Sequence, residues 1–263
     1  MDGASDNDNE GLTQLSLRHP VLRTNKLSQL RSWLWTIPVA MLTTAVLITA
    51  AVGAVLVAPG GRRQQWFQHK WGAAVLGIVG APVKVLGVER IDATANYVIA
   101  ANHGSLMDIS VLFGWLPMPF KFLAKRELLK VPFIGWYLRR DGHLTVDRKS
   151  LRSSVESTNE CARLIREKRL SVLIFPEGTR SPDGELQRFR DGAAFLAIQS
   201  GVPLLPVAIA GAYDVLPARS SWFMPGEIEL RFGDPIPVEG LTARDRAALT
   251  ARLEQAVREL LAE

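Results

Sequence analysis

The chain has a single cysteine, Cys161, and only four histidines among its 263 residues. One cysteine excludes an internal disulfide and a zinc cluster built from cysteines, and scattered histidines give a metal site little support. Cys161 lies in an amphipathic helical stretch, where a small buried thiol is the expected role. Low cysteine use is typical of a reducing compartment. We therefore expect neither a bound metal nor a cofactor.

Several common functional motifs are also missing. The nucleophile elbow G-x-S-x-G does not occur, and neither do the phosphate-binding loops G-x-x-x-x-G-K-[ST] and G-x-G-x-x-G. The net charge of +5 and the pI near 9.6 favour anionic partners. Because no helix-turn-helix, zinc-finger or RNA-binding signature accompanies this charge, a membrane surface or a phosphorylated substrate is favoured over nucleic acid.

Charge is absent from a long stretch near the N-terminus. A polar segment, 1–32, precedes residues 33–58, which contain no charged side chain and are long enough to cross a hydrocarbon core of roughly 30 Å. Pro59-Gly60-Gly61 then interrupts the pattern, and a shorter apolar stretch follows at 71–83. We expect 33–84 to be a retained membrane anchor, either a single span or a helical hairpin that dips into one leaflet. Basic residues on both sides leave its orientation open.

From residue 85 to 263, short β-branched runs alternate with helical stretches, which predicts one α/β domain with a central mixed sheet flanked by helices. Strands are expected at 83–91, 97–101, 143–146, 171–175, 204–210 and 227–232. Helices are expected near 105–116, 125–139, 151–168, 189–199 and 242–262.

The stretch Asn102-His103-Gly104-Ser105-Leu106-Met107-Asp108 sets a histidine five residues before an aspartate at the end of a predicted strand. A carboxylate that holds the second imidazole nitrogen makes histidine a well-oriented general base near neutral pH. Five residues of an ideal helix turn through roughly 140°, so His103 must lie on the turn before the helix that carries Asp108. Ser105 and Asp108 also have the spacing of a capping box, and a purely structural role explains the pattern as well.

A second polar motif, Phe175-Pro176-Glu177-Gly178-Thr179-Arg180-Ser181, follows another predicted strand. The forked guanidinium of Arg180 suits phosphate oxygens, and Glu177 either holds Arg180 or contacts a substrate hydroxyl. A solvated turn with a weak ion pair is the alternative. Because ligands of open α/β sheets collect beyond the carboxyl ends of the strands, we expect this loop and His103 to face one cleft.

A third cluster, between residues 120 and 148, mixes cations with aromatic side chains. This mixture is typical of a surface where acyl chains and headgroups meet, although a half-buried domain face has a similar composition. His143 and Asp147 form a rival pair, since a spacing of four on a strand places both on one face. Nothing in the sequence around them supplies a turn or an anion site. The aromatic residues are Phe120, Phe122, Phe133, Trp136 and Tyr137.

Together these blocks resemble the glycerophospholipid acyltransferases of the 1-acyl-sn-glycerol-3-phosphate acyltransferase type. The family's first block, Asn-His-x-Ser-x-x-Asp, is matched by residues 102–108, and its third by 175–181. Its second resembles Lys125-Arg126-Glu127-Leu128 with Val146-Asp147-Arg148, and its fourth resembles Val202-Pro203-Leu204-Leu205-Pro206-Val207. A departure at His143-Leu144-Thr145, where the family tends to be more apolar, bears on the role of Arg148.

The resemblance implies a glycerol-3-phosphate acyltransferase-like domain on the cytoplasmic side of the inner membrane. His103, oriented by Asp108, would take the proton from the free hydroxyl of 1-acyl-glycerol-3-phosphate as it attacks an acyl thioester, giving phosphatidic acid without an acyl-enzyme. The donor would be acyl-CoA or acyl-carrier protein. Residues implied in substrate binding are Glu177, Gly178, Thr179, Arg180, Lys125, Arg148, Asn102 and Ser105.

Two alternatives stay open at the level of the sequence. The acceptor could be another lysolipid, such as a lyso-ornithine lipid, because the motifs specify the reaction better than the headgroup. A membrane-anchored lipid-binding protein that retains the fold without turnover is the other possibility, and the intact pair of His103 and Asp108 disfavours it.

Overall fold

A seven-stranded sheet forms the centre of the protein, in the order β1-β7-β6-β2-β5-β3-β4. The computed structural model describes residues 26–57, 62–131, 134–147 and 150–263. β6 and β7 are antiparallel and the other neighbouring strands are parallel, so the predicted mixed sheet is confirmed. The strands are β1 Val83–Leu86, β2 Val98–Ala101, β3 Phe120–Lys125, β4 Leu144–Val146, β5 Ser171–Ile174, β6 Leu204–Ala210 and β7 Ile228–Phe232.

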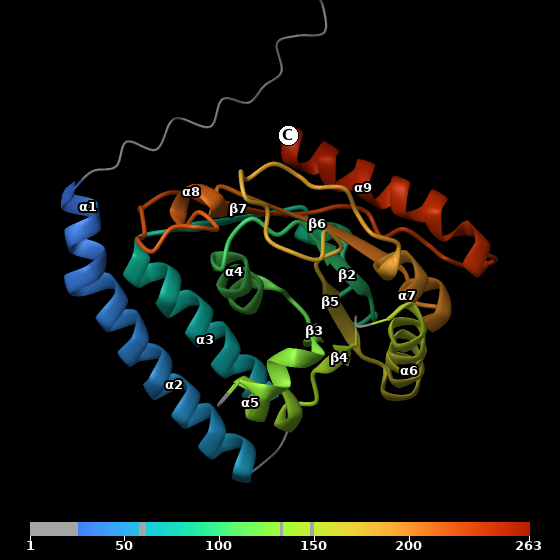
Figure 1. Ribbon diagram of the computed structural model, residues 1–263, viewed down its shortest axis with the longest axis horizontal. Helices are drawn as coiled ribbons and strands as arrows, with labels where there is room; N and C mark the ends of the chain where they lie inside the picture. Colours follow the sequence, from blue (N-terminus) through green and yellow to red (C-terminus); the bar gives the residue numbers. More distant parts are fainter. Residues whose placement is uncertain (1–25, 58–61, 132–133, 148–149) are drawn as a thin grey trace, which may run out of the picture.

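Helices cover both faces of this sheet (Figure 1). One face packs against α3, α4 and α8, and the other packs against α6, α7 and α9. The helices are α1 Lys26–Arg31, α2 Ile37–Val57, α3 Arg62–Val79, α4 Met107–Trp115, α5 Ile134–Arg140, α6 Leu151–Lys168, α7 Gly192–Ser200, α8 Ala212–Val215 and α9 Arg246–Ala262.

The central strand β2 is buried on both faces, as its unbroken apolar sequence requires. Ile99 and Ala101 face the cluster under α3 and α4, whereas Val98 and Ala100 face the cluster under α6, α7 and α9. This alternation continues past the end of the strand. It directs Asn102 and His103 to opposite faces of the sheet edge.

One strand was not predicted. Residues 120–125 form β3, and the helix expected at 125–139 is replaced by a 3₁₀ turn, Arg126–Lys130, followed by the short α5. The rings of Phe120 and Phe122 pack against Phe113 at centroid distances of 5.5 and 5.1 Å, which buries one face of β3. The sequence Phe-Lys-Phe-Leu-Ala-Lys is compatible with a strand that has one apolar face.

The N-terminal helices form an antiparallel pair. α1, a π-helical turn at Ser32–Thr36 and α2 follow one another, and α3 returns alongside α2. By length and composition, one helical stretch among the described residues, Lys26–Leu47, could cross a membrane, and only 11% of an 18-residue apolar window within it is buried. Residues 1–25 of the predicted polar segment lie outside the described residues.

α3 packs closely on the α/β domain. Its residues Val75, Leu76 and Val79 are buried in the core, and Gly72 meets α4 so closely that an added Cβ would lie 2.4 Å from the carbonyl oxygen of Ser110. The predicted boundary at residue 84 thus follows a helix that packs on the sheet and on α4. At the other end of the pair, Ser32 Oγ accepts a hydrogen bond of 3.0 Å from the backbone N–H of Phe223.

Candidate active site

His103 and Asp108 form a hydrogen-bonded pair at the carboxyl edge of β2. The imidazole Nδ1 lies 2.8 Å from Asp108 Oδ2. His103 lies on the turn between β2 and α4, and Asp108 lies in the first turn of α4, which confirms the arrangement predicted from their spacing. With Nδ1 directed at the carboxylate, the N–H belongs on Nδ1 and Nε2 keeps its lone pair. His103 therefore has the geometry of a general base.

Asp108 is buried and accepts two further hydrogen bonds, from the backbone N–H groups of Gly104 and Ser105 at 3.0 and 2.9 Å. Burial raises the pKa of this carboxyl above its ordinary value, and the contacts with His103 and the two N–H groups oppose that rise. The bond to Ser105 N–H is the reciprocal half of a capping box. Asp108 therefore both starts the helix and holds the imidazole.

The side chains of Asn102 and Ser105 form hydrogen bonds with the protein backbone, which leaves them engaged within the fold. The Asn102 amide donates to the carbonyl oxygen of Ile209 at 3.0 Å and accepts from the N–H of the same residue at 2.8 Å, which joins the ends of β2 and β6. Ser105 Oγ donates to the carbonyl oxygen of Leu216 at 2.7 Å and accepts from Met107 N–H at 3.1 Å. Both side chains hold the turn that carries His103.

Glu177 lies at the end of β5 and is 3% exposed. Its Oε1 accepts from the backbone N–H of His103 at 2.6 Å, and its Oε2 accepts from the backbone N–H of Gln187 at 3.3 Å. Burial raises the pKa of the Glu177 carboxyl to about 7, against the lowering effect of the two N–H donors. Both carboxylate oxygens thus bind backbone N–H groups, and no ion pair joins Glu177 to Arg180 in the described part of the chain.

A second backbone bond joins the two predicted motifs, since Ser181 N–H donates to the carbonyl oxygen of His103 at 2.8 Å. The two motifs are therefore adjacent through their backbones, as expected for segments that follow neighbouring strands. Phe175, the residue after β5, stacks on the His103 imidazole at a centroid distance of 3.9 Å and an angle of 13°. The sequence does not predict this role, because an aromatic residue at the end of a buried strand is expected to pack in the hydrophobic core.

Gly178, Thr179 and Arg180 form the turn after Glu177. Gly178 has a φ of 79°, a conformation that favours glycine, and it lets the chain reverse directly behind Glu177. Thr179 is exposed and Arg180 is partly exposed. Within the described part of the chain, the Arg180 guanidinium has neither an ion pair nor a side-chain hydrogen bond. Its donors are therefore available to an anionic ligand.

Lys125 ends β3 on the same edge of the sheet, because β3 is the neighbour of β5. Lys125 lies two residues after Leu123 and therefore on the same face of β3, and Leu123 packs in the cluster under α6 and α7. Phe175, which stacks on His103, packs instead in the cluster under α3 and α4. The structure thus brings Lys125 to the edge but on the opposite face from His103. Arg148, the other predicted cation, lies outside the described residues.

His143 and Asp147, the rival pair, each contact other residues in the structure. His143 Nε2 lies 2.9 Å from Asp141 Oδ2, and its Nδ1 accepts from the backbone N–H of Phe122 at 2.9 Å. Asp147 instead contacts Arg126 at 3.2 Å. Burial lowers the pKa of His143, which favours the neutral ring that this bonding pattern requires. His143 therefore extends the contact between β3 and β4.

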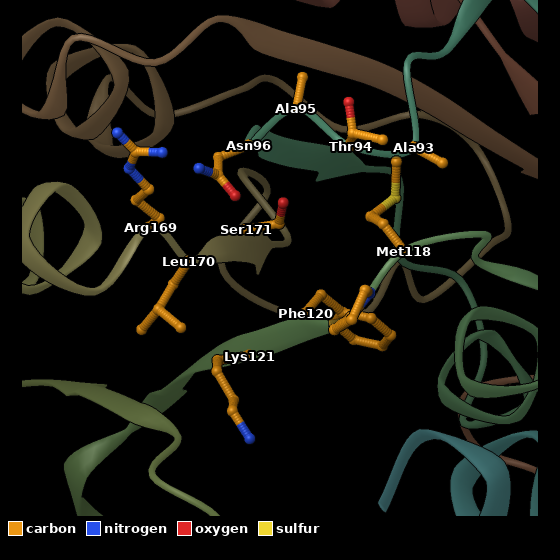
Figure 2. Close-up of a pocket in the computed structure, with 11 residues that line it drawn as sticks. Ala93, Thr94, Ala95, Asn96, Met118, Phe120, Lys121, Arg169, Leu170 and Ser171 are labelled. Carbon is orange, nitrogen blue, oxygen red and sulfur yellow. The ribbon is translucent and has the colours of Figure 1, made fainter. Parts of the chain in front are cut away.

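A small cavity of about 160 Å³ lies at the opposite edge of the sheet (Figure 2). It is lined by the residues that precede β2, the first residues of β3 and those that begin β5, such as Asn96, Phe120 and Ser171. His103 follows the carboxyl end of β2, so this cavity belongs to another part of the molecule. No group of three metal-ligating side chains occurs among the residues that the structure describes.

The fold and site together define a class of α/β proteins in which a histidine and a buried aspartate, separated by four residues, lie at the carboxyl edge of a largely parallel sheet. Residues 82–210 match the family model described as Acyltransferase. This region of the chain belongs to the Acyltransferase family.

Several named relatives are similar to the chain. A 1-acyl-sn-glycerol-3-phosphate acyltransferase of Cocos nucifera is 30% identical over 202 residues, which cover 76% of the chain and 65% of that protein. The alpha form of Homo sapiens is 31% identical over 180 residues, which cover 68% and 64%. The chain therefore spans just under two thirds of the length of these relatives.

A solved structure is also similar. The crystal structure of the 1-acyl-sn-glycerophosphate (LPA) acyltransferase PlsC from Thermotoga maritima superposes with a TM-score of 0.72 at 28% identity. The match covers 90% of the chain and 98% of that protein. The α/β sheet flanked by helices is therefore an arrangement shared with a solved acyltransferase.

Proposed function

We propose that this protein transfers a fatty acyl group from a thioester donor to the free hydroxyl of 1-acyl-glycerol-3-phosphate, which yields phosphatidic acid. The observation that carries this proposal is the bond between His103 and the buried Asp108, which leaves Nε2 of the imidazole as a proton acceptor. The names of the relatives support the choice of acceptor. Either acyl-CoA or acyl-carrier protein suits this chemistry as donor.

In the proposed reaction, the acceptor oxygen forms a bond to the thioester carbonyl carbon while its proton passes to His103 Nε2. Asp108 stabilises the imidazolium that forms, because its carboxylate lies 2.8 Å from Nδ1. The tetrahedral intermediate then expels the thiolate by breaking the C–S bond, and the proton on Nε2 passes to the sulfur. The products are an ester and a free thiol, and no acyl-enzyme is required.

Arg180 is the residue that we propose for the acceptor's phosphate. A guanidinium presents paired donors that match phosphate oxygens, and those of Arg180 are not engaged by the described residues. Its turn is tied to the catalytic turn, since Ser181 N–H donates to the carbonyl oxygen of His103. A phosphate bound there would place the glycerol hydroxyl within a short reach of the imidazole.

We further propose that the N-terminal helices lie in one leaflet rather than cross the bilayer, with the catalytic domain on the cytoplasmic side of the inner membrane. α2 packs along α3, and the other side of α3 packs against α4. A perpendicular span by α2 would draw α3 and part of the α/β domain into hydrocarbon. A helix that lies along the interface avoids that cost and brings a lipid acceptor to the sheet edge.

The test is the release of free thiol from acyl-CoA by the purified full chain in detergent, with 1-acyl-glycerol-3-phosphate as acceptor. His103→Ala should lower the rate by at least about 100-fold, the usual contribution of a positioned base. Asp108→Asn should lower it similarly, because the neutral amide cannot stabilise an imidazolium. Full turnover by His103→Ala would remove the general base from the proposal.

An acceptor panel tests the substrate. Thiol release with a lyso-ornithine lipid but none with 1-acyl-glycerol-3-phosphate would show that the headgroup is wrong while the chemistry is right. Release with no lysolipid, by a protein that still binds them, would identify a lipid-binding protein without turnover.

A further inference from the structure

The segment that follows β3 carries an exposed surface that the proposed reaction does not use. The 3₁₀ turn Arg126–Lys130 and α5 pack as one unit at Gly135, where an added Cβ would lie 2.1 Å from the carbonyl oxygen of Leu129. Gly135 N–H also donates to the carbonyl oxygen of Val131 at 2.8 Å. We call the exposed side chains of this unit the α5 patch, namely Leu128, Lys130, Val131, Trp136 and Arg140.

Three members of the α5 patch are large apolar side chains that water contacts. Leu128, Val131 and Trp136 are each 39% exposed, although leucine and valine usually lie inside a domain. Neighbouring exposed apolar side chains, one of them tryptophan, are typical of a surface that enters the boundary between headgroups and acyl chains. The patch thus has the apolar component of a lipid contact.

The same unit is strongly basic. Residues 125–140 contain five cations and one acid, a net charge of +4 in a chain whose total is +5. Arg126 is paired with Asp147, and Lys125 lies 4.0 Å from Glu127. Lys130 and Arg140 are exposed and have no carboxylate partner in the described part of the chain. Their charge is therefore available to an anionic surface.

The α5 patch also adjoins the helices that we propose to lie in the membrane. Gln68 Nε2 on α3 donates to the Tyr137 hydroxyl on α5 at 3.1 Å, which fixes α5 beside α3 (Figure 1). Trp136 and Arg140 belong to the same short helix as Tyr137, so the patch lies on an element that adjoins the helical pair. A bilayer that accepts α2 and α3 would therefore lie within reach of α5.

We propose that the α5 patch is a second membrane contact, which binds the anionic headgroup region of the leaflet that holds α2 and α3. This inference rests on the proposed function only for the presence of a membrane. The three exposed apolar side chains and the adjoining helices favour lipid over an acidic protein. Binding at this second point would hold the carboxyl edge of the sheet, which carries His103, at a fixed distance from the lipid acceptor.

The experiment uses the full chain with one environment-sensitive fluorophore. Burial raises the pKa of the Cys161 thiol to about 11, so an exposed cysteine introduced by Leu128→Cys can be labelled selectively. Gln255→Cys, on the exposed side of α9, is the matched control. Each labelled protein is mixed with vesicles of phosphatidylcholine, with or without phosphatidylglycerol. The emission wavelength then reports whether the label is in water or in lipid.

We expect a blue shift for the label at 128 on the anionic vesicles, weakened by salt, and none for the label at 255. Lys130→Gln with Arg140→Gln should lower the ratio of lipid-embedded to water-exposed label about 25-fold, because each cation near an anionic surface contributes about 5-fold. The control pair Lys168→Gln and Arg252→Gln removes the same charge from α6 and α9, and should leave the ratio unchanged.

Two outcomes would overturn the contact. The first is a label at 128 that stays in water while the protein sediments with anionic vesicles. The second is a blue shift of that label caused by an acidic acyl-carrier protein in the absence of lipid. Thiol release, measured on the same samples, separates the two proposals. Release with a water-exposed label refutes only the α5 contact, and an embedded label without release refutes only the acyltransferase reaction.

Discussion

The carboxylate of Glu177 accepts a hydrogen bond of 2.6 Å from the backbone N–H of His103. A buried side chain from one motif thereby fixes the main chain of the proposed general base in the other. Ser181 N–H completes the connection from the opposite side, by donating to the carbonyl oxygen of His103. Because both backbone groups of His103 are held by the loop after β5, the position of the imidazole depends on that loop as much as on Asp108.

Glu177 should therefore act as a positioning residue. Glu177→Ala leaves the N–H of His103 unpaired in a partly buried site, and should lower kcat by about 10- to 100-fold with little change in the acceptor KM, since a small misplacement of a base has that effect. Glu177→Gln retains an oxygen for this N–H and should recover most of kcat. Steady-state kinetics measure both. A raised acceptor KM at unchanged kcat would mean that Glu177 contacts substrate instead.

The stability of the protein should fall as pH rises from 4.5 to about 7 because of Glu177. Burial raises the pKa of its carboxyl to about 7 in the folded protein, from an ordinary value of 4.5. The folded state thus binds the proton more tightly, so the stabilisation is complete below pH 4.5 and is lost by about pH 7. The difference corresponds to about 3 kcal/mol.

This pH effect can be isolated with Glu177→Gln, which cannot ionise. Denaturant unfolding between pH 4.5 and 8 should show a steeper loss of stability for the natural chain than for this variant. Parallel curves for the two proteins would show that Glu177 does not titrate in this range.

Arg180 should bind the acceptor in the ground state and the transition state alike. Arg180→Ala should raise the KM for 1-acyl-glycerol-3-phosphate by about 10-fold or more at a similar kcat, the pattern of a lost uniform binding interaction. Arg188→Ala removes an exposed cation from the same loop region and serves as the control. If the acceptor KM is the same in Arg180→Ala and the natural chain, another group binds the phosphate.

The sequence was sufficient to predict the edge of the sheet at which the site lies, but not what holds the site together. Histidine after β2 and the Glu177 turn after β5 were placed together because ligands of α/β sheets collect beyond the strand ends. The bond from Asn102 to Ile209 joins residues 107 positions apart, and no local pattern encodes such a partner. β3 was missed for a related reason, since its strand character depends on the packing of Phe120 and Phe122 against Phe113.

Asn102 should matter for stability rather than for substrate affinity. Asn102→Ala removes two hydrogen bonds and leaves the N–H and carbonyl of Ile209 unpaired, which should cost about 2 to 4 kcal/mol. Asn159→Ala, at an exposed position of α6, should change the free energy of unfolding by less than about 0.5 kcal/mol. Denaturant unfolding in detergent provides the comparison. Equal stability of the two variants would contradict the bridging role.

The contact between α3 and α4 should link the N-terminal helices to catalysis. Gly72→Ala introduces a Cβ that would lie 2.4 Å from the carbonyl oxygen of Ser110 and 2.6 Å from the backbone nitrogen of Gly114, so α3 and α4 must separate. The cost should be about 1 to 3 kcal/mol or more. Because α4 carries Asp108, its displacement should also weaken the bond to His103 and lower kcat.

Gly77→Ala is the matched substitution on the same helix. An added Cβ there meets nothing within 4 Å, so the variant should gain up to about 1 kcal/mol from the higher helix propensity of alanine and retain its turnover. Unfolding and thiol release are measured on both variants. A Gly72→Ala protein as stable and active as Gly77→Ala would show that the close approach of α3 to α4 is not required, and that the helical pair can shift without disturbing Asp108.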